Sequence, residues 1–276
     1  MKTVLVTGTS SGIGRATAIT LAGRGWRVYA GVRKTADGEA LVSEAGDSVV
    51  PVILDVTDEA SVTRAVGQIR EETGGRLDGL VNNAGVYHGA PLEMMKPEEI
   101  RRTLDVNVTG LLEVTRQCLP LLRASEGRIV NISSISGLVA LPGVSVYAGS
   151  KHAVEAITDS LRVELKGFGI RVAAVEPGSI RTPIWDKGAA RDEAREEDPD
   201  IQAVRPLYER LVSLLEKLNS RPGVLPPEEV AETVAEALES DSPKNRYIVG
   251  KDAKSLALLR KLPDAVRDRL ISARLG

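Results

Sequence analysis

The chain has 276 residues, 42% apolar and 27% charged, with a formal net charge of −2, which gives enough length for one large α/β domain and an ordinary globular composition. The near-neutral net charge does not suggest the basic patch of a nucleic-acid-binding protein. No apolar run reaches the ~18 residues of a membrane-spanning helix, so we expect a cytoplasmic protein with no integral membrane span. One cysteine and two histidines exclude an internal disulfide and lead us to expect no metal site, so the chemistry must come from hydroxyls, lysines, carboxylates or a bound organic cofactor.

Short β-rich apolar runs alternate with helical patterns along most of the chain. The predicted strands, in chain order, are Val4–Val6, Val28–Ala30, Val49–Ile53, Gly79–Val81, Arg128–Ile132, Val172–Val175 and Tyr247–Val249. This alternation implies right-handed βαβ units and therefore a parallel sheet with helices on both faces. The predicted fold class is α/β: a doubly wound Rossmann-type parallel sheet of about seven strands, forming a single domain over residues 1–276.

The pattern changes after residue 178. Residues 178–225 contain an acidic stretch, Asp192–Asp200, which is typical of a solvated helix or a mobile loop, and an amphipathic segment, Pro206–Leu218. We predict that this region forms a substrate-binding loop or lid. Residues 251–276 carry leucines at helical spacing with Arg and Lys between them, which predicts a C-terminal helical extension packed on the domain. A membrane-surface role of this extension is the alternative.

A glycine-rich stretch directly follows the first strand: Thr7-Gly8-Thr9-Ser10-Ser11-Gly12-Ile13-Gly14. Its glycines permit a sharp turn, a close approach of the backbone to a pyrophosphate and tight packing of a helix on the strand. The N–H groups at the helix start would then face the phosphates. A plain strand-to-helix turn also uses glycine and serine, but the position at the first βα junction favours dinucleotide binding. The predicted contacts in this loop are Gly8, Ser10, Ser11, Gly12, Ile13 and Gly14.

Further motifs complete a family pattern. The glycine loop has the spacing T-G-x-x-x-G-x-G, Asn82-Asn83-Ala84-Gly85 follows the fourth strand, Tyr147 and Lys151 form Y-x-x-x-K, and Pro177-Gly178 follows the sixth strand. In this order the motifs resemble those of the classical short-chain dehydrogenase/reductase family. The phrase Val28-Tyr29-Ala30-Gly31-Val32 and the long C-terminus look somewhat like its hydroxysteroid and retinol dehydrogenase branch. The resemblance is close over about two thirds of the chain.

The predicted catalytic group centres on the tyrosine and the lysine. Residues four apart share a helix face, so the Lys151 ammonium can favour ionisation of the Tyr147 phenol, whose reference pKa of ~10 is too high for easy proton exchange at neutral pH. The resemblance implies that Ser134, thirteen residues before Tyr147, donates to the substrate oxygen, while the adjacent Ser133 is structural. It also implies that Asn107 helps to hold a water that links the lysine to solvent. The predicted catalytic residues are Asn107, Ser134, Tyr147 and Lys151.

The resemblance further implies the residues that bind the rest of a nicotinamide dinucleotide. Asp55 would accept a hydrogen bond from the adenine amino group, while Ile180 and Thr182 would cover the nicotinamide and bind its carboxamide. The predicted contacts outside the glycine loop are Arg33, Asp55, Val56, Asn83, Ala84, Gly85, Tyr147, Lys151, Pro177, Gly178, Ile180 and Thr182.

The end of the second strand bears on the choice between NADP(H) and NAD(H). NAD-binding units place an acidic residue about 20 positions after the glycine loop, where it accepts from the ribose 2′-OH. Val32 occupies that point here, and Arg33 and Lys34 follow. A guanidinium attracts a 2′-phosphate, so NADP(H) is the preferred cofactor and NAD(H) the alternative. The alternative stays open because Arg33 could merely stack on adenine, and because Asp37 could turn back toward the ribose.

The predicted activity is therefore hydride transfer between nicotinamide and a secondary alcohol or ketone. The expected lid contains five apolar side chains, Ile184, Trp185, Ile201, Val204 and Leu207. They favour a steroid-, retinoid- or lipid-like substrate, with a broad-range carbonyl reductase or a carrier-bound 3-oxoacyl reductase as alternatives. A non-catalytic NADP(H)-binding sensor, or a lyase, epimerase or dehalogenase on this fold, would usually alter the tyrosine, lysine, serine or glycine loop, and all are present.

Members of this family are commonly homodimers or homotetramers. They pack their fourth and fifth helices across a two-fold axis, and the segments Ile100–Leu122 and Val146–Phe168 would supply those faces here. We therefore expect a homo-oligomer whose partners are copies of itself and a small-molecule alcohol or ketone substrate.

Overall fold

The computed structural model describes residues 1–183, 198–219 and 225–273. Its strands are β1 (Thr3–Thr7), β2 (Arg27–Val32), β3 (Val49–Ile53), β4 (Gly79–Asn82), β5 (Arg128–Ile132), β6 (Arg171–Pro177) and β7 (Arg246–Val249). They form one seven-stranded sheet in the order β3-β2-β1-β4-β5-β6-β7, and every pairing is parallel. The predicted doubly wound α/β fold is confirmed. The strand order reverses between β1 and β4, which is where ligands bind in folds of this class.

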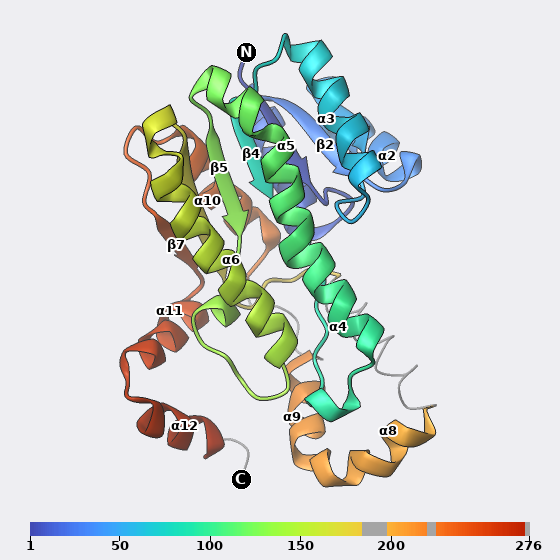
Figure 1. The fold of residues 1–276 in the computed structure, drawn as a ribbon, viewed down its shortest axis with the longest axis vertical. Helices are drawn as coiled ribbons and strands as arrows, with labels where there is room; N and C mark the ends of the chain where they lie inside the picture. Colours follow the sequence, from blue (N-terminus) through green and yellow to red (C-terminus); the bar gives the residue numbers. More distant parts are fainter. Residues whose placement is uncertain (184–197, 220–224, 274–276) are drawn as a thin grey trace.

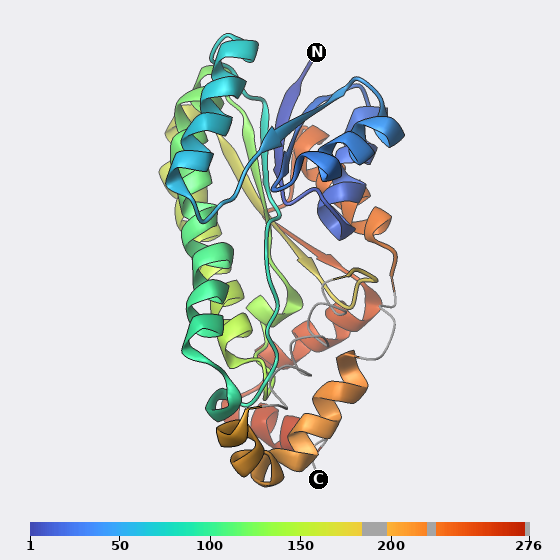
Figure 2. The same ribbon diagram turned by 90° about the vertical axis from the view of Figure 1, so that its right-hand side faces the viewer.

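Helices cover both faces of the sheet, as the edge-on view shows (Figures 1 and 2). One face carries α1 (Gly12–Gly23), α2 (Thr35–Ala45) and α10 (Pro227–Glu239), and the other carries α3 (Glu59–Thr73), α5 (Gly110–Ser125) and α6 (Ser145–Glu164). Because each parallel strand is followed by a helix that must return across the sheet, the chain winds to one side in its first half and to the other in its second.

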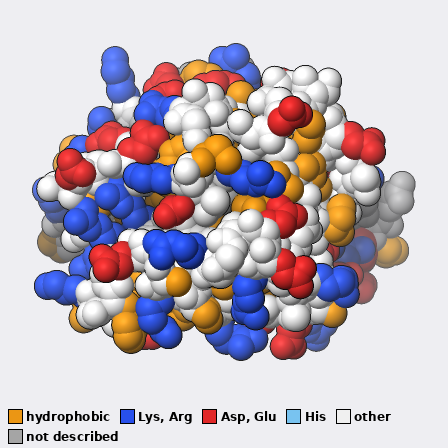
Figure 3. Space-filling view, turned by 90° about the horizontal axis from the view of Figure 1, so that it is seen from above, with side chains coloured by type: hydrophobic (Ala, Val, Ile, Leu, Met, Phe, Trp, Pro, Cys, Tyr) orange, Lys and Arg blue, Asp and Glu red, His pale blue; other side chains and the backbone are white. Residues whose placement is uncertain are grey.

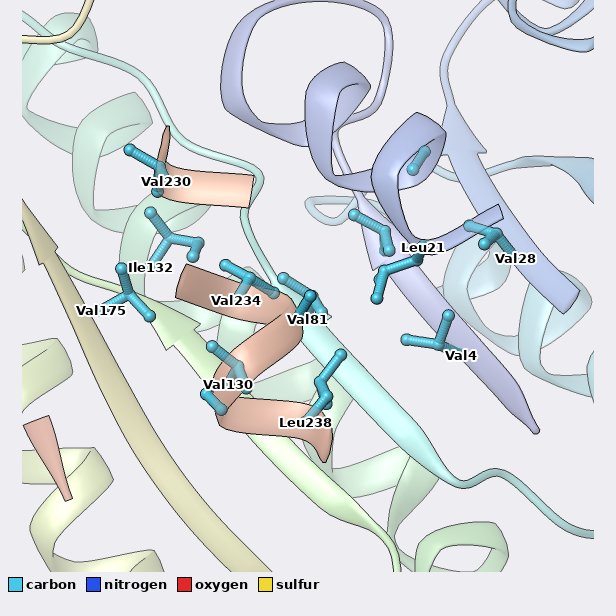
Figure 4. Close-up of a cluster of buried hydrophobic side chains, with 14 of the residues drawn as sticks. Val4, Leu21, Val28, Val81, Val130, Ile132, Val175, Val230, Val234 and Leu238 are labelled. Atoms are coloured by element: carbon cyan, nitrogen blue, oxygen red, sulfur yellow. The ribbon is translucent and has the colours of Figure 1, made fainter. Parts of the chain in front are cut away.

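Alternation along the strands builds a core on each face. Val4 and Val6 point to the α1 and α10 side, where they share a cluster with Leu21 and Leu238, whereas Leu5 between them joins the cluster under α3 and α5. All of these side chains are at most 1% exposed, as expected for a sheet buried on both sides. Figure 4 shows the first cluster, in which strand valines face α1 and α10. The two cores hold the strand ends, and hence the site, in fixed positions.

The remaining elements lie around the carboxyl ends of the strands, except η4, which precedes the start of β6. They are η1 (Leu92–Met94), α4 (Pro97–Leu104), η2 (Asp105–Thr109), η3 (Ile135–Gly137), η4 (Lys166–Phe168), α8 (Pro199–Val204), η5 (Arg205–Tyr208), α9 (Glu209–Asn219), α11 (Lys251–Ala257), η6 (Leu258–Lys261) and α12 (Asp264–Ser272). The helix α4 leads directly into α5, and α8 and α9 lie beside its free end (Figure 1). Most of the acidic stretch at 192–200 lies outside the described residues.

The described surface carries charges of both signs. On the face seen from above, Lys and Arg side chains lie among Asp and Glu side chains (Figure 3), in keeping with the net charge of −2. In the described part of the chain, no helix combines the length and the apolar character needed to cross a membrane.

Candidate active site

A single cleft runs across the carboxyl ends of the strands. Of the site residues predicted from the sequence, all except Gly14 and Asn107 line it. The segments that build it follow β1, β2, β3, β4, β5 and β6, so residues far apart in the sequence meet because parallel strands end at the same edge. Gly14 and Asn107 lie behind the lining and shape it.

The glycine loop has the backbone that dinucleotide binding needs. Gly8 and Gly12 have φ values of 71° and 58°, a left-handed conformation that other residues adopt only with strain. A Cβ at Gly8 would lie 2.9 Å from the Cα of Ala84, and a Cβ at Gly14 would collide with the carbonyl oxygen of Gly8 and the Asn83 amide. Glycine is therefore required at 8 and 14 by close packing. The turn leads into α1 at Gly12, whose first N–H groups face the cleft region.

The Asn83 side chain fixes this loop against the end of β4. Its Nδ2 donates to the carbonyl oxygens of Thr7 and Gly8 at 2.9 and 3.0 Å. In return, the Thr7 hydroxyl oxygen accepts from the backbone N–H groups of Asn83 and Ala84 at 3.0 and 2.9 Å. The N-N-A-G motif thus holds together the two strands between which the order reverses.

The neighbouring Asn82 braces the sheet centre. Its Nδ2 donates to Thr115 Oγ1 and to Asn131 Oδ1, both at 2.9 Å, and Asn131 passes the chain on to Thr158 of α6 at 2.9 Å. All four residues are buried. This buried polar chain ties β4 and β5 to the helix that carries Tyr147 and Lys151.

Tyr147, Lys151 and Ser134 meet at one end of the cleft. Burial raises the pKa of Tyr147 above its ordinary value, while a hydrogen bond with Ser134 acts in the opposite direction. The Lys151 Nζ donates to the carbonyl oxygen of Ile132 at 2.8 Å and lies 5.8 Å from the centre of the Tyr147 ring. Burial lowers the pKa of Lys151 to about 8, against the effect of the Glu155 carboxylate.

One expectation about this group is therefore wrong for the structure as described. The lysine does lie near the phenol, but the pKa of Tyr147 is raised, not lowered. The reason is that burial removes water from the phenolate, and that the Lys151 ammonium is directed to the Ile132 carbonyl.

Asn107 lies in η2, a π-helical turn between α4 and α5. Such wide turns are frequently found at functional sites. Its Oδ1 accepts from the Val86 N–H at 2.8 Å, and its Nδ2 donates to the Val86 carbonyl and the Ser150 hydroxyl, both at 3.0 Å. Asn107 therefore fixes the backbone that follows the N-N-A-G motif to the catalytic helix. Its expected role in holding a water stays a prediction.

The turn after β6 closes the cleft from the other side. Gly178 N–H donates to the Val249 carbonyl at 2.9 Å, and Ile180 forms an isolated parallel bridge with Leu225. Beyond it, Thr182 lies so close to the glycine loop that a Cβ at Gly12 would be 3.1 Å from its side chain. The residues expected to cover the nicotinamide thus lie across the start of α1.

Asp55 occupies the opposite end of the cleft. Burial acts to raise its pKa, but hydrogen bonds from the Thr57 hydroxyl and N–H, at 2.7 and 3.0 Å, and the charges of Arg33 and Arg102 together hold that pKa below its usual value. Arg102 also lines the cleft, and it was missed in the sequence. The available signal was its spacing: Arg102 lies one helical turn before Val106, which lines the same cleft.

Tyr87 is another cleft residue that the sequence analysis missed. Its ring meets the Tyr147 ring edge to face, with centroids 5.0 Å apart and an interplanar angle of 77°. Tyr87 is 6% exposed and lines the cleft. Tyr87 thus forms a wall beside the Tyr147 phenol, which is predicted to transfer the proton. No sequence pattern after the N-N-A-G motif indicated that Tyr87 would lie in the cleft.

A mostly apolar cavity of about 410 Å³ lies next to this end, lined by residues including Met94, Ile201, Val212 and Leu215, together with the polar side chains of Gln202, Arg205 and Glu216. Leu215 also packs in a cluster with Tyr87 and Tyr147, so the cavity adjoins the catalytic group. Of the five expected lid residues, Ile201 and Val204 pack in the cluster at its wall. Leu207 is 78% exposed and does not pack in this cluster, so its place in a lid stays a prediction. Ile184 and Trp185 lie outside the described residues.

The fold and the site define a class: an oxidoreductase that uses a nicotinamide dinucleotide. The glycine loop at the first crossover, the strand-order reversal beside it and the Tyr-Lys-Ser group at the end of the same cleft are its defining features. No group of His, Cys, Asp and Glu suited to a metal ion occurs among the residues described. The family model of short chain dehydrogenases matches residues 2–193, and the chain belongs to that family.

Relatives over the whole length agree with this assignment. The chain is 35% identical to the NADPH-dependent 3-dehydrocapnine reductase of Ornithobacterium rhinotracheale, with 98% of this chain and 96% of that protein covered. It is 38% identical to 17-beta-hydroxysteroid dehydrogenase type 6 of Bos taurus, with 98% and 88% covered. The crystal structure of a short-chain dehydrogenase from Streptomyces avermitilis is similar with a TM-score of 0.81 at 31% identity, covering 98% and 95% of the two chains.

Proposed function

We propose that this enzyme prefers NADP(H) and transfers a hydride between nicotinamide and a secondary alcohol or ketone on an apolar substrate. The observation that carries the proposal is the arrangement of one cleft. Ser134, Tyr147 and Lys151 meet at one end, and Arg33 lines the other, where Val32 stands in place of an acidic residue. The NADPH-dependent reductase among the relatives supports the same cofactor.

The residues of the chain divide the proton chemistry between them. When bound, the nicotinamide cofactor supplies or accepts the hydride. The Tyr147 hydroxyl gives a proton to the substrate oxygen in reduction and takes it back in oxidation, while the Ser134 hydroxyl donates a hydrogen bond to that oxygen. Since the pKa of Lys151 is about 8, this side chain is protonated in most molecules at neutral pH. This charge, 5.8 Å from the centre of the Tyr147 ring, opposes the unfavourable effect of burial on the phenolate left after proton transfer, and Lys151 with Asn107 supports return of the proton.

The substrate proposal rests on the mostly apolar cavity beside Tyr87 and Tyr147. Its volume of about 410 Å³ and its lining by Met94, Ile201 and Leu215 suit the body of a steroid-, retinoid- or lipid-like molecule. A relative named as a hydroxysteroid dehydrogenase supports this class. A polar, carrier-free small ketone would leave the cavity unfilled and gain little from it.

The assembly proposal is a homodimer or homotetramer built on α4, α5 and α6. In the single chain these helices expose apolar side chains to solvent: Leu112 is 42% exposed, and Val163 is 69% exposed. Covering such side chains with a second copy is favourable, at about 25 cal/mol for each Å² of apolar surface removed from water.

Replacement of Tyr147 by Phe tests the catalytic assignment. The variant removes only the hydroxyl, so the fold and cofactor binding should persist while turnover falls about 10²- to 10⁴-fold, the usual contribution of a positioned general acid. We would measure NADPH-dependent reduction of steroid, retinoid and long-chain aliphatic ketones, and cofactor binding by fluorescence titration. Tyr247→Phe is the matched control, because that hydroxyl accepts from the Lys244 N–H in a loop away from the cleft.

Two results would count against the proposal. Turnover of Tyr147→Phe within tenfold of the wild type would remove the phenol from the mechanism. A wild-type enzyme that reduces none of the ketones with NADPH, yet oxidises the alcohols with NAD, would refute the cofactor preference.

A further inference from the structure

The adenosine end of the cleft contains two arginines from different parts of the chain. Arg33 follows β2, and Arg102 belongs to α4, which comes after β4 in the chain. Both residues line the same cleft. Both residues are exposed, and the charges of both act on the Asp55 carboxylate in the same cleft. Two guanidinium groups around one carboxylate leave a net positive charge at this end.

Neither arginine forms an ion pair with a carboxylate of the described residues. Among the residues that the structure describes, no carboxylate lies within ion-pair distance of Arg33 or Arg102, although many other arginines on the surface form such pairs. The Asp55 Oδ1 is already bound to the N–H and hydroxyl of Thr57. Two like charges facing one cleft without direct partners repel each other, and an anion placed between them would be held by both.

The direction of Arg102 is set by its helix. Arg101 and Arg102 are neighbours on α4 and both are exposed, but only Arg102 lines the cleft. One turn further on, Val106 lines the cleft too, and Asn107 is buried against the Val86 backbone. Because residues four apart share a helix face, the packing of Val106 and Asn107 turns Arg102 inward and Arg101 away.

We propose that Arg102 is a second determinant of cofactor specificity, which binds the 2′-phosphate of NADP(H) from α4 opposite Arg33. This inference rests on the proposed preference for NADP(H). The 2′-phosphate is the group that distinguishes the two cofactors, it carries nearly two negative charges, and it accepts charge-assisted hydrogen bonds from guanidinium groups. Two cations in one cleft hold it more selectively than Arg33 alone.

The test uses two ligands that differ only in the 2′-phosphate, adenosine 2′,5′-bisphosphate and adenosine 5′-monophosphate. Calorimetric titration would give their dissociation constants for the wild type, Arg33→Ala, Arg102→Ala and Arg101→Ala. We expect Arg102→Ala to weaken the bisphosphate about tenfold or more, to leave the monophosphate within twofold, and to lose part of this effect at high salt. Arg101→Ala, which removes a neighbouring charge on the same helix, should leave both constants within twofold.

The outcomes separate this inference from the proposed function. A wild-type protein that binds both nucleotides equally overturns the NADP(H) preference and the role of Arg102 with it. A wild-type preference that disappears in Arg33→Ala but persists in Arg102→Ala keeps the proposed function and overturns the inference. Equal losses for both nucleotides in Arg102→Ala would assign Arg102 to adenine stacking, and equal losses in Arg101→Ala would assign the effect to the general charge of α4. Either result also overturns the inference.

Discussion

Glu176, at the end of β6, should make the stability of this protein fall as pH rises. The side chain is completely buried. Arg246 Nε lies 3.2 Å from its Oε1 and also 2.9 Å from Glu155 Oε2. Burial and the nearby Glu155 carboxylate raise the pKa of Glu176 to about 8, from 4.5, and the charge of Arg246 offsets this only in part. Two carboxyl groups that share one guanidinium in a buried site do not both ionise easily.

The size and sign of the effect follow from proton linkage. Below pH 4.5 both the folded and the unfolded chain hold the proton on Glu176, so the group contributes nothing. Between 4.5 and about 8 the folded state binds one proton more than the unfolded state, so the free energy of unfolding decreases as pH rises, at about 1.4 kcal/mol per pH unit for one full proton. Above pH 8 the full cost is present. Glu176→Gln has no proton to lose, and this slope should disappear.

The assay is urea unfolding of the wild type, Glu176→Gln and Glu71→Gln at several pH values from 5 to 8. A changed contact with Arg246 in Glu176→Gln can shift its whole curve, but only the titration changes the slope, so slopes are compared. Glu71 lies on the exposed side of α3, and its variant should run parallel to the wild type. If wild type and Glu176→Gln lose stability with pH at the same rate, Glu176 is ionised at neutral pH and the reasoning fails.

Two further predictions concern a glycine and the cysteine. Gly14→Ala should weaken binding of adenosine 2′,5′-bisphosphate at least tenfold, because a Cβ there collides with the Gly8 carbonyl and the Asn83 amide. Gly23→Ala, whose Cβ meets nothing within 4 Å, should bind this nucleotide normally. Equal affinities of the two variants in a calorimetric titration would contradict this. Cys118 is fully buried and burial raises its pKa to about 12, so a colorimetric disulfide reagent at pH 8 should react with it only after addition of urea, and rapid reaction with the folded protein would show that the thiol is accessible.

The sequence was most informative where structure depends on local pattern. The strands could be predicted because a strand that is buried on both faces consists of a nearly continuous run of Val, Leu and Ile. The cleft residues could be predicted because the glycine loop, N-N-A-G, Y-x-x-x-K and P-G motifs occur in a fixed order. Arg102 and Tyr87 were missed for a different reason. Their place in the cleft depends on how α4 and the turn after β4 lean over the sheet, which is decided by long-range contacts such as the Asn107–Val86 hydrogen bonds.

The pKa of Tyr147 was misjudged for a related reason. A spacing of four places Lys151 near the phenol, but it does not say how deeply the pair is buried or that the Ile132 carbonyl takes the ammonium. Burial acts on each group in proportion to the water removed from its charged form, and no local sequence pattern measures that. The environment of a side chain therefore has to come from the three-dimensional packing even when its position is evident from a motif.

The C-terminal extension is part of the same site through Asp252. Its Oδ2 accepts from the Ser179 N–H at 2.8 Å, and a Cβ at Gly178 would lie 2.5 Å from that oxygen. The glycine of the P-G step is therefore needed here because a carboxylate from α11 occupies the space that a side chain would fill. Since the same turn leads to Ile180 and Thr182, the helix that follows β7 fixes the segment expected over the nicotinamide. A change in the extension can consequently reach the segment expected over the nicotinamide through one hydrogen bond.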